Sequence, residues 1–405
     1  MYVLILATCD TRGPEAAWLR SRLDRLGVPS RVVDTGCLGP PACTVDIDRE
    51  EVFAAAGASP EELRAGSRGR AVSAAAEGAR RVVLRALEAG ELAGVLGIGG
   101  SAGTTIGTAA MRALPLGIPK LMVSTEASGE VRPFVGDRDL LMLHSVVDPA
   151  GTNRLTAKVL GLAVTAMTGM VQNRLTVAML EPGTRARLPV AVTGSGVTTA
   201  AVERARGALE EAGHEVVVFD ATGSGGAGLE SLVRGGALLG LLDLTTGELG
   251  DELLIGGDPS APGRLTAAAE RGLPQVVSVG ALDTLGLGRR ALPGRVLEGR
   301  RIHEHDPGVA LARTTPEECT RLGRTLGERL AASEGPAAIL LPGRGVSALD
   351  ASGQAFDDPE ARRALFEAIH SSCGPVPCRT LDHHINDPEF AEAAARELIT
   401  LLQQI

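Results

Sequence analysis

Aromatic residues and lysines are scarce in this 405-residue chain, and both shortages narrow the possible structures. Phe, Trp and Tyr together make up 2% of the sequence, whereas 44% of the residues are hydrophobic. The interior must therefore be aliphatic, built from Val, Leu, Ile and Ala. Lysine occurs only at Lys120 and Lys158, so nearly all of the positive charge is arginine.

The chain also lacks the surplus of positive charge that a nucleic-acid surface needs. Its formal net charge is -9, whereas proteins that bind a phosphate backbone present a basic patch. We therefore predict that the protein binds no nucleic acid.

Cysteine spacing excludes two further classes of protein. The six cysteines are scattered, and no two of them have C-x-x-C spacing. Neither a structural zinc site nor a disulfide scaffold is expected from such a pattern.

We expect neither a membrane span nor an export signal in this sequence. The apolar residues 1–6 lack a basic start and lead directly into the polar residues 8–13, so they are better interpreted as a first strand than as a signal peptide. No apolar run approaches the length of a membrane span. We expect a cytoplasmic protein that contacts no membrane.

What is present is one structural plan used twice. Each half begins with a short apolar strand, a turn rich in glycine and threonine, a helix that ends at glycine, and a second strand that ends at aspartate. These strands and helices are expected at 2–8, 14–26 and 30–33 in the first half, and at 190–193, 200–212 and 215–219 in the second. A further strand, helix and strand follow in both halves, over 94–124 and 240–278.

Continuous apolar strands that alternate with helices indicate parallel sheets covered on both faces. We therefore predict an α/β fold of two tandem, doubly wound, Rossmann-like domains. The expected domains are 1–180 and 190–405, joined by a linker over 180–189.

Residues 94–105 form the most informative stretch. An apolar strand at 94–98 is followed by a glycine-rich turn at 99–105 and by an apolar helix at 106–114. In such a unit, backbone N–H groups of the turn and of the helix start can bind a phosphate. The turn is neither a Walker loop nor a spaced G-x-G-x-x-G fingerprint, and tight packing alone also produces glycine-rich turns.

Other polar residues are expected at the same edge of the sheet, because ligands of doubly wound sheets bind beyond the carboxyl ends of the strands. Asp10, between Thr8 and Thr11, could hold a ribose or position Mg²⁺ through water, or it could cap the next helix. We predict a nucleotide site formed by Thr8, Asp10, Thr11, Gly99, Gly100, Ser101, Gly103, Thr104, Ser124, Thr125 and Gly129.

In the second half, acidic and basic groups gather near predicted strand ends. Asp243 and Glu248 lie close in sequence, although Glu248 could simply favour a helix start. His303 and His305 alternate like one face of a strand, and with Asp243 or Asp283 they could bind a divalent metal. Arg313 could bind an anionic substrate through its fork, or pair with Asp243 or Asp283. The predicted catalytic residues are Asp243, Glu248, His305 and Arg313.

Several motifs occur in order along the chain. They lie at 7–13, 97–101, 119–129 and 145–153 in the first half, and at 221–226, 242–249, 274–283 and 313–315 in the second. In these motifs the sequence resembles the ATP-binding family named after the tomato mosaic virus resistance protein, and the resemblance covers nearly the whole chain.

The resemblance implies two α/β domains, ATP binding by the first of them, and a homodimer. It supplies no reaction, and the plant members carry a further C-terminal barrel-like domain. Two residues depart from the pattern: Ser67 stands where an aspartate is expected, and Ala102 where a glycine is expected. The first departure puts a role for that aspartate in doubt, and the second narrows the predicted phosphate site.

Three functions remain open at this point. The first is an ATP-dependent enzyme, with or without Mg²⁺, that acts on a small anionic metabolite in a cleft between the domains. The second is a nucleotide-sensing binding protein without turnover. The third is a nucleotide-independent hydrolase or lyase that uses the acidic and histidine groups of the second domain.

Overall fold

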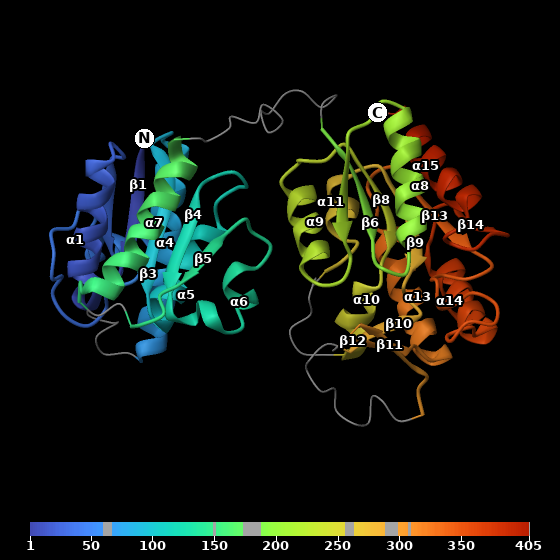
Figure 1. Cartoon of the computed structure of the whole chain (residues 1–405). Coiled ribbons are helices and arrows are strands. Elements are labelled where there is room, and N and C mark those ends of the chain that lie inside the picture. The colour runs from blue at the N-terminus through green and yellow to red at the C-terminus, as the bar shows by residue number, and fades with distance from the viewer. Residues whose placement is uncertain are drawn as a thin grey trace. The chain divides into compact units, whose positions relative to one another are not determined.

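The computed structural model describes residues 1–59, 67–148, 151–172, 188–255, 263–287, 299–306 and 309–404. The chain forms two compact units, Met1–Thr176 and Val177–Ile405, called unit 1 and unit 2 below. Figure 1 shows that each unit contains a central sheet flanked by helices.

Unit 1 has a five-stranded parallel sheet with the strand order β2-β1-β3-β4-β5. Its strands are β1 (Tyr2–Ala7), β2 (Ser30–Asp34), β3 (Leu92–Gly99), β4 (Lys120–Ser124) and β5 (Leu141–His144). The order reverses direction between β1 and β3. In doubly wound sheets, ligands bind beside the carboxyl ends of the strands at such a reversal.

Helices cover both faces of this sheet (Figure 1). One core contains the apolar sides of α2 (Arg49–Ala55), α4 (Arg68–Glu88) and α5 (Ser101–Arg112), and the other contains those of α1 (Cys9–Arg25) and α7 (Arg154–Gln172). The side chains in both cores are almost all aliphatic, as the scarcity of aromatic residues predicts. The short helices η1 (Thr125–Ser128) and α6 (Arg132–Val135) follow β4.

Helix α7 corrects one expectation from the sequence. Within the described residues it is the one helix long and apolar enough to cross a membrane by length and composition. The prediction that no apolar run approaches the length of a membrane span is therefore wrong. One face of α7, with Leu160, Val164 and Met167, is buried in the core against the sheet. Core helices pass the same test of length and composition, so α7 is weak evidence for a membrane span.

Unit 2 repeats the plan with one additional strand. Its parallel sheet has the order β14-β13-β9-β8-β6-β7, so β6 and β8 correspond to β1 and β3 of unit 1. The strands are β6 (Val190–Gly194), β7 (Val216–Asp220), β8 (Gly240–Thr245), β9 (Gln275–Gly280), β13 (Ala337–Pro342) and β14 (Cys378–Leu381).

Helices again form two outer layers. One core holds α8 (Thr199–Glu211) and α15 (Pro388–Leu402); on the opposite side lie α9 (Ser224–Arg234), α11 (Ala267–Arg271), α13 (Pro316–Ala331) and α14 (Pro359–Ser372). After β8 come the short helix α10 (Glu248–Gly250) and the π-helical turn η4 (Asp251–Ile255). A small antiparallel sheet of β10 (Thr284–Leu287), β12 (Val309–Arg313) and β11 (Ile302–Asp306) lies between β9 and α13 in the chain.

The predicted α/β class, with two doubly wound parallel sheets, is confirmed, and the differences are local. Helix α1 begins at Cys9 rather than at Pro14, with a kink at Arg12. The additional antiparallel sheet was not foreseen. Most of the predicted linker at 180–189 lies outside the described residues.

Candidate functional site

The reversal point of unit 1 brings together the turns that follow β1 and β3. Helix α5 starts after Gly100, and none of the described side chains caps its first turn. The first N–H groups of a helix lack partners within the helix and carry a partial positive charge. A Cβ atom added at Gly100 would meet only Thr125 Oγ1, at 3.8 Å, so this side of the turn is open.

The other glycines of the turn have a packing role. A Cβ at Gly99 would lie 2.7 Å from the Cα of Gly103, and a Cβ at Gly103 would lie 3.2 Å from the carbonyl oxygen of Ile98. The packing explanation for glycine therefore holds at these two positions. Gly100 is left as the glycine at which a ligand can approach.

Two buried hydroxyls fix the turn against the next strand. Thr104 Oγ1 lies 2.6 Å from Ser124 Oγ and donates to the carbonyl of Gly100 at 2.8 Å. Both side chains are fully buried, so they position the turn rather than contact a ligand. Ser101 is exposed and Thr125 is partly exposed at the same edge, whereas Gly129 ends η1.

The turn after β1 supplies two further hydroxyls. Thr8 Oγ1 and Thr11 Oγ1 lie 2.9 Å apart at the start of α1. Arg12, on the same turn, forms an ion pair with Asp148 of the loop after β5. The carboxylate of Glu15 on α1 accepts a hydrogen bond from the backbone of Gly151 in that loop. The loop after β5 is thereby held against the start of α1.

Asp10 is bound by the backbone of the loop after β2, and the suggestion that it caps the helix was wrong. Its Oδ2 accepts hydrogen bonds from the backbone N–H groups of Leu38 at 2.7 Å and Gly39 at 3.3 Å. The Arg49 guanidinium is 3.9 Å from Asp10 and 2.7 Å from the buried Asp34. Asp10 therefore fixes the loop after β2, and it does not cap α1.

At the reversal point of unit 2, between β6 and β8, the same region is filled by the chain's own charges. The fully buried Arg264 contacts Asp243 at 2.9 Å, Glu248 at 3.0 Å and Glu230 at 3.3 Å. Asp243 also accepts a hydrogen bond from Thr193 at 2.7 Å. Two of the predicted catalytic residues therefore lie together, but within a buried ion cluster.

Glu248 also fills the glycine turn at the start of α9. Its Oε1 accepts hydrogen bonds from the N–H groups of Gly223 at 3.0 Å and Gly226 at 3.2 Å. Burial raises the pKa of Glu248, while Arg264 and these two N–H groups oppose the increase. The carboxylate occupies the position that a phosphate takes in other glycine turns.

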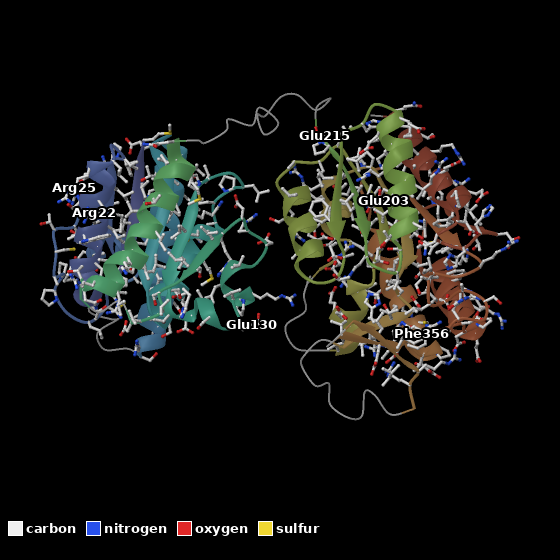
Figure 2. All side chains as sticks on the ribbon, viewed as in Figure 1. Arg22, Arg25, Glu130, Glu203, Glu215 and Phe356 are labelled. Carbon is white, nitrogen blue, oxygen red and sulfur yellow. The ribbon has the colours of Figure 1, made fainter. Side chains whose placement is uncertain are left out.

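Arg313 belongs to a separate cluster, beside α13 and the loop before α14. It donates to the carbonyl of Phe356 at 2.9 Å and forms an ion pair with Asp350 at 3.3 Å. Phe356, labelled in Figure 2, lies near the small antiparallel sheet, where its ring contacts His303 edge to face. The partner of Arg313 is therefore Asp350, and not Asp243 or Asp283.

Asp283 follows β9 and is almost completely buried next to this cluster. Its Oδ2 accepts a hydrogen bond from Ser347 at 2.7 Å, and its Oδ1 has no partner among the described residues. Burial and the nearby Asp350 raise the pKa of Asp283 to about 6, against an opposing effect of Arg313.

His305 is the one predicted catalytic residue of unit 2 that is exposed. Its Nε2 lies 3.1 Å from the position that a Cβ of Gly196 would occupy, over the turn between β6 and α8. His303 faces Phe356 instead. Within the part of the chain that the structure describes, no group of three or more His, Cys, Asp or Glu side chains could hold a metal ion.

Sequence reasoning missed Arg264, Glu230, Arg49 and Asp34, which hold the turns in place. One usable signal was present: residues 223–228, which form the N-cap and the start of α9, fit the pattern G-x-G-x-x-G. That pattern marks a glycine turn suited to an anion, although here the anion is Glu248.

With this geometry established, comparison with known sequences decides the family. Models of the N-terminal and C-terminal domains of the uncharacterised protein family UPF0261 match residues 1–176 and 187–402. The chain belongs to family UPF0261. The resemblance inferred from the motifs is confirmed, because the tomato proteins also match.

Relatives of the UPF0261 chain include bacterial and plant proteins. A UPF0261 protein of Clostridium tetani is 38% identical over 99% of both chains, and one of Rhizobium meliloti is 41% identical over 97% of both. The ToMV resistance protein Tm-1(GCR237) of Solanum lycopersicum is 41% identical over 75% of this chain, which corresponds to 40% of the tomato protein. A solved glycosyltransferase of Streptomyces nogalater covers 99% of both chains at 14% identity and a TM-score of 0.18, a value too low to carry an argument.

Proposed function

We propose that this UPF0261 protein binds ATP in unit 1, at the turns that follow β1 and β3. The observation that carries the proposal is the uncapped start of α5 beside the open face of Gly100, at the reversal point of the sheet. The hydroxyls of Thr8, Thr11 and Ser101 border the same edge and would donate to phosphate oxygens.

Mg²⁺ would accompany the nucleotide rather than occupy a site made of protein side chains. Magnesium commonly binds through substrate phosphates, water and one or two carboxylates. The Asp10 carboxylate is already bound to the backbone of the loop after β2. We therefore expect the phosphates and water to supply most of the ligands of the metal ion.

A small anionic metabolite would bind in unit 2 at the turn between β6 and α8. The side chain of the N-cap residue Thr198 does not cap α8, although Asn386 Oδ1 accepts a hydrogen bond from the Ala201 N–H at 3.3 Å. The exposed His305 lies over Gly196 in the turn before this helix. Helix N–H groups, the Ser195 hydroxyl and an imidazole N–H together suit a carboxylate or a phosphate. Asp243 and Glu248 support unit 2 through Arg264 and would not contact this metabolite.

Calorimetric titration with ATP tests the proposal for unit 1. The Gly100→Val variant should fold, because its Cβ has space, and its affinity for ATP should fall by about tenfold or more, since the side chain blocks the approach of a phosphate. Gly207→Val, on α8 where an added Cβ also meets nothing within 4 Å, serves as the matched control. Unchanged ATP affinity in Gly100→Val would overturn the assignment.

A second candidate function, nucleotide sensing without turnover, is favoured by a specific observation. Three of the four predicted catalytic side chains, Asp243, Glu248 and Arg313, are buried and held in ion pairs. Single-turnover measurements with labelled ATP and candidate small acids separate the two functions. Bound ATP that is recovered intact in every mixture would identify a sensor.

We further propose that the protein is a homodimer, as the family resemblance implies. The outer face of α7 exposes Leu155 and Leu162 by 60% and 63%. A second copy could bury these side chains, since homodimer interfaces are rich in apolar surface.

A further inference from the structure

A pocket of about 410 Å³ lies in unit 1 beyond the carboxyl end of β2, between the loop after that strand and the start of α2. Its volume falls within the range of small-molecule sites. The nucleotide proposed above uses only the neighbouring turns after β1 and β3. This pocket lies at the end of β2, the strand next to β1, and so offers a concave surface for the remainder of the ligand.

The walls of the pocket are partly apolar and rigid. Leu38, Pro40 and Pro41 line it from the loop, and Phe53 lines it from α2. The loop is fixed because Asp10 accepts hydrogen bonds from the N–H groups of Leu38 and Gly39. Proline rings and an aromatic side chain suit the flat face of a heterocyclic base.

The charges in the pocket exclude a phosphate. The one arginine that lines the pocket, Arg49, is paired with the buried Asp34 at 2.7 Å. Asp48 and Glu50 line the pocket as well. Because Arg49 is neutralised by Asp34, these two carboxylates give the pocket a net negative charge. Such a surface repels phosphate oxygens, whereas carboxylates accept hydrogen bonds from ribose hydroxyls and from an exocyclic amine.

The spacing between the two places fits one nucleotide. β2, β1 and β3 are adjacent in the sheet, and neighbouring strands lie about 4.8 Å apart. The pocket at β2 and the open turn at β3 are therefore separated by roughly 10 Å across the sheet, measured as two strand spacings. A nucleoside and its phosphate chain can span such a distance.

We propose that this pocket binds the nucleoside part of the ligand, a neutral purine ribonucleoside, while the turn at Gly100 binds the phosphates. The proposal rests on the function proposed above. It adds a second subsite, formed by the loop after β2 and by α2, that no motif in the sequence indicated.

Alkylation of Cys37 tests the pocket in the unmodified protein, because this partly exposed cysteine lines it. Iodoacetamide labelling, measured by peptide mass, should slow in the presence of ATP or adenosine and remain unchanged with inorganic triphosphate. Labelling of Cys378, a partly exposed cysteine of unit 2, should not respond to any of the three and serves as the internal control.

A pair of variants separates this inference from the proposed function. Gly39→Trp should fill the pocket, since an added Cβ meets nothing within 4 Å. It should lower ATP affinity by about tenfold or more and leave triphosphate affinity unchanged. Gly207→Trp is the matched control, and Gly100→Val should lose triphosphate binding but keep the protection of Cys37 by adenosine.

Two results would overturn the nucleoside subsite. One is an unchanged rate of Cys37 labelling under ATP that calorimetry shows to be saturating. The other is protection by triphosphate alone. If ATP fails to bind at all, the proposed function falls, and protection by adenosine still decides the nature of the pocket. Labelling of the wild-type protein also decides it if Gly39→Trp does not fold.

Discussion

The two units share a strand order but differ in what lies at the reversal point of each sheet. In unit 1 the start of α5 has no described side-chain cap, and Gly100 faces open space. In unit 2 the residue Glu248, which follows β8 at the reversal point, is held by the buried Arg264, and its carboxylate binds the start of α9, the helix that follows the edge strand β7. A helix start after a parallel strand thus serves a proposed external anion in one unit and an internal carboxylate in the other, although the two helices follow strands at different positions in their sheets. Sheet topology places a candidate anion site, but the neighbouring charges decide whether a carboxylate of the chain itself occupies it.

Loss of Arg264 should produce the largest effect, because unit 2 depends on that charge. Arg264→Met leaves Asp243, Glu248 and Glu230 buried without their cation, which should lower the free energy of unfolding by about 3–5 kcal/mol. Calorimetry measures this loss. The single tryptophan, Trp18 in α1, reports on unit 1, and its fluorescence transition should not move.

The control for this variant is Arg206→Met, which breaks an exposed pair with Glu203 on α8. Exposed pairs contribute at most about 1 kcal/mol. A loss in Arg264→Met that is no larger than that of the control would contradict the role given to the buried cluster.

The next effect concerns pH and the second buried cluster of unit 2. The pKa of Asp283 is raised to about 6 in the folded protein, against about 3.9 in an unfolded chain. The folded state therefore binds the proton more tightly. The stability that this confers is present below about pH 4 and is lost as the pH rises through 6, by on the order of 3 kcal/mol.

Asp283→Asn should remove this dependence. Urea unfolding of the wild type and of the variant at pH 4.5 and pH 7 measures it, because the other titrating groups are common to both proteins. The variant should gain stability relative to the wild type as the pH rises. An equal pH response in the two proteins would show that Asp283 titrates normally.

A smaller effect is expected from placing a carboxylate of the chain itself at the start of α5 in unit 1, as Glu248 does for α9 in unit 2. Ala102 is the second residue of α5, and Ala102→Glu places a carboxylate at the uncapped helix start. Stability should rise by about 0.3–1 kcal/mol through the helix dipole. ATP affinity, measured by calorimetry, should fall by about tenfold through repulsion of the phosphates.

Ala102→Gln is the matched control, because it has the same shape without the charge. It should retain most of the ATP affinity. If Glu and Gln weaken ATP binding equally, the effect is steric, and the proposed electrostatic similarity between the two units fails.

The smallest effect on stability is expected from changing the exposed leucines of α7 in unit 1, which we propose as the dimer interface. Leu162→Glu on α7 should leave folding intact, since this side chain is 63% exposed. Light scattering should change from about twice the 41.6 kDa chain mass to a single chain mass. Leu26→Glu, at the end of α1, should stay dimeric, and a wild-type monomer would defeat the proposal.

The sequence predicted the elements whose signals are local. The apolar runs of β3 and β8 and the glycines that follow the helices gave the strands, the turns and the repeated plan. The antiparallel sheet of β10, β11 and β12 was missed, because its strands are short and follow segments of mixed polarity. Its pairing depends on residues far apart in the chain, such as Thr284 and Arg313.

Site residues divide in the same way. Gly100, Thr8 and Thr11 could be placed because the end of a parallel strand fixes their position. The partners of Asp10, Asp243 and Glu248 could not, since a carboxylate carries no signal for the group that it will meet. Arg264 is separated from Asp243 by 21 residues, and only the folded chain brings the two together.

Glu248 also affects how the two units would respond to the composition of their surroundings. Because the Glu248 carboxylate is part of the chain, its effective concentration at the glycine turn of unit 2 is fixed. The N–H groups of that turn therefore keep their hydrogen bonds under all conditions in which Glu248 is ionised. Under the proposed function, the turn of unit 1 depends on dissolved nucleotide, and its stability rises by RT ln(1 + [L]/Kd), about 2.7 kcal/mol at a hundredfold excess over Kd. The stability of unit 1 would then vary with the nucleotide concentration, whereas the stability of unit 2 would not.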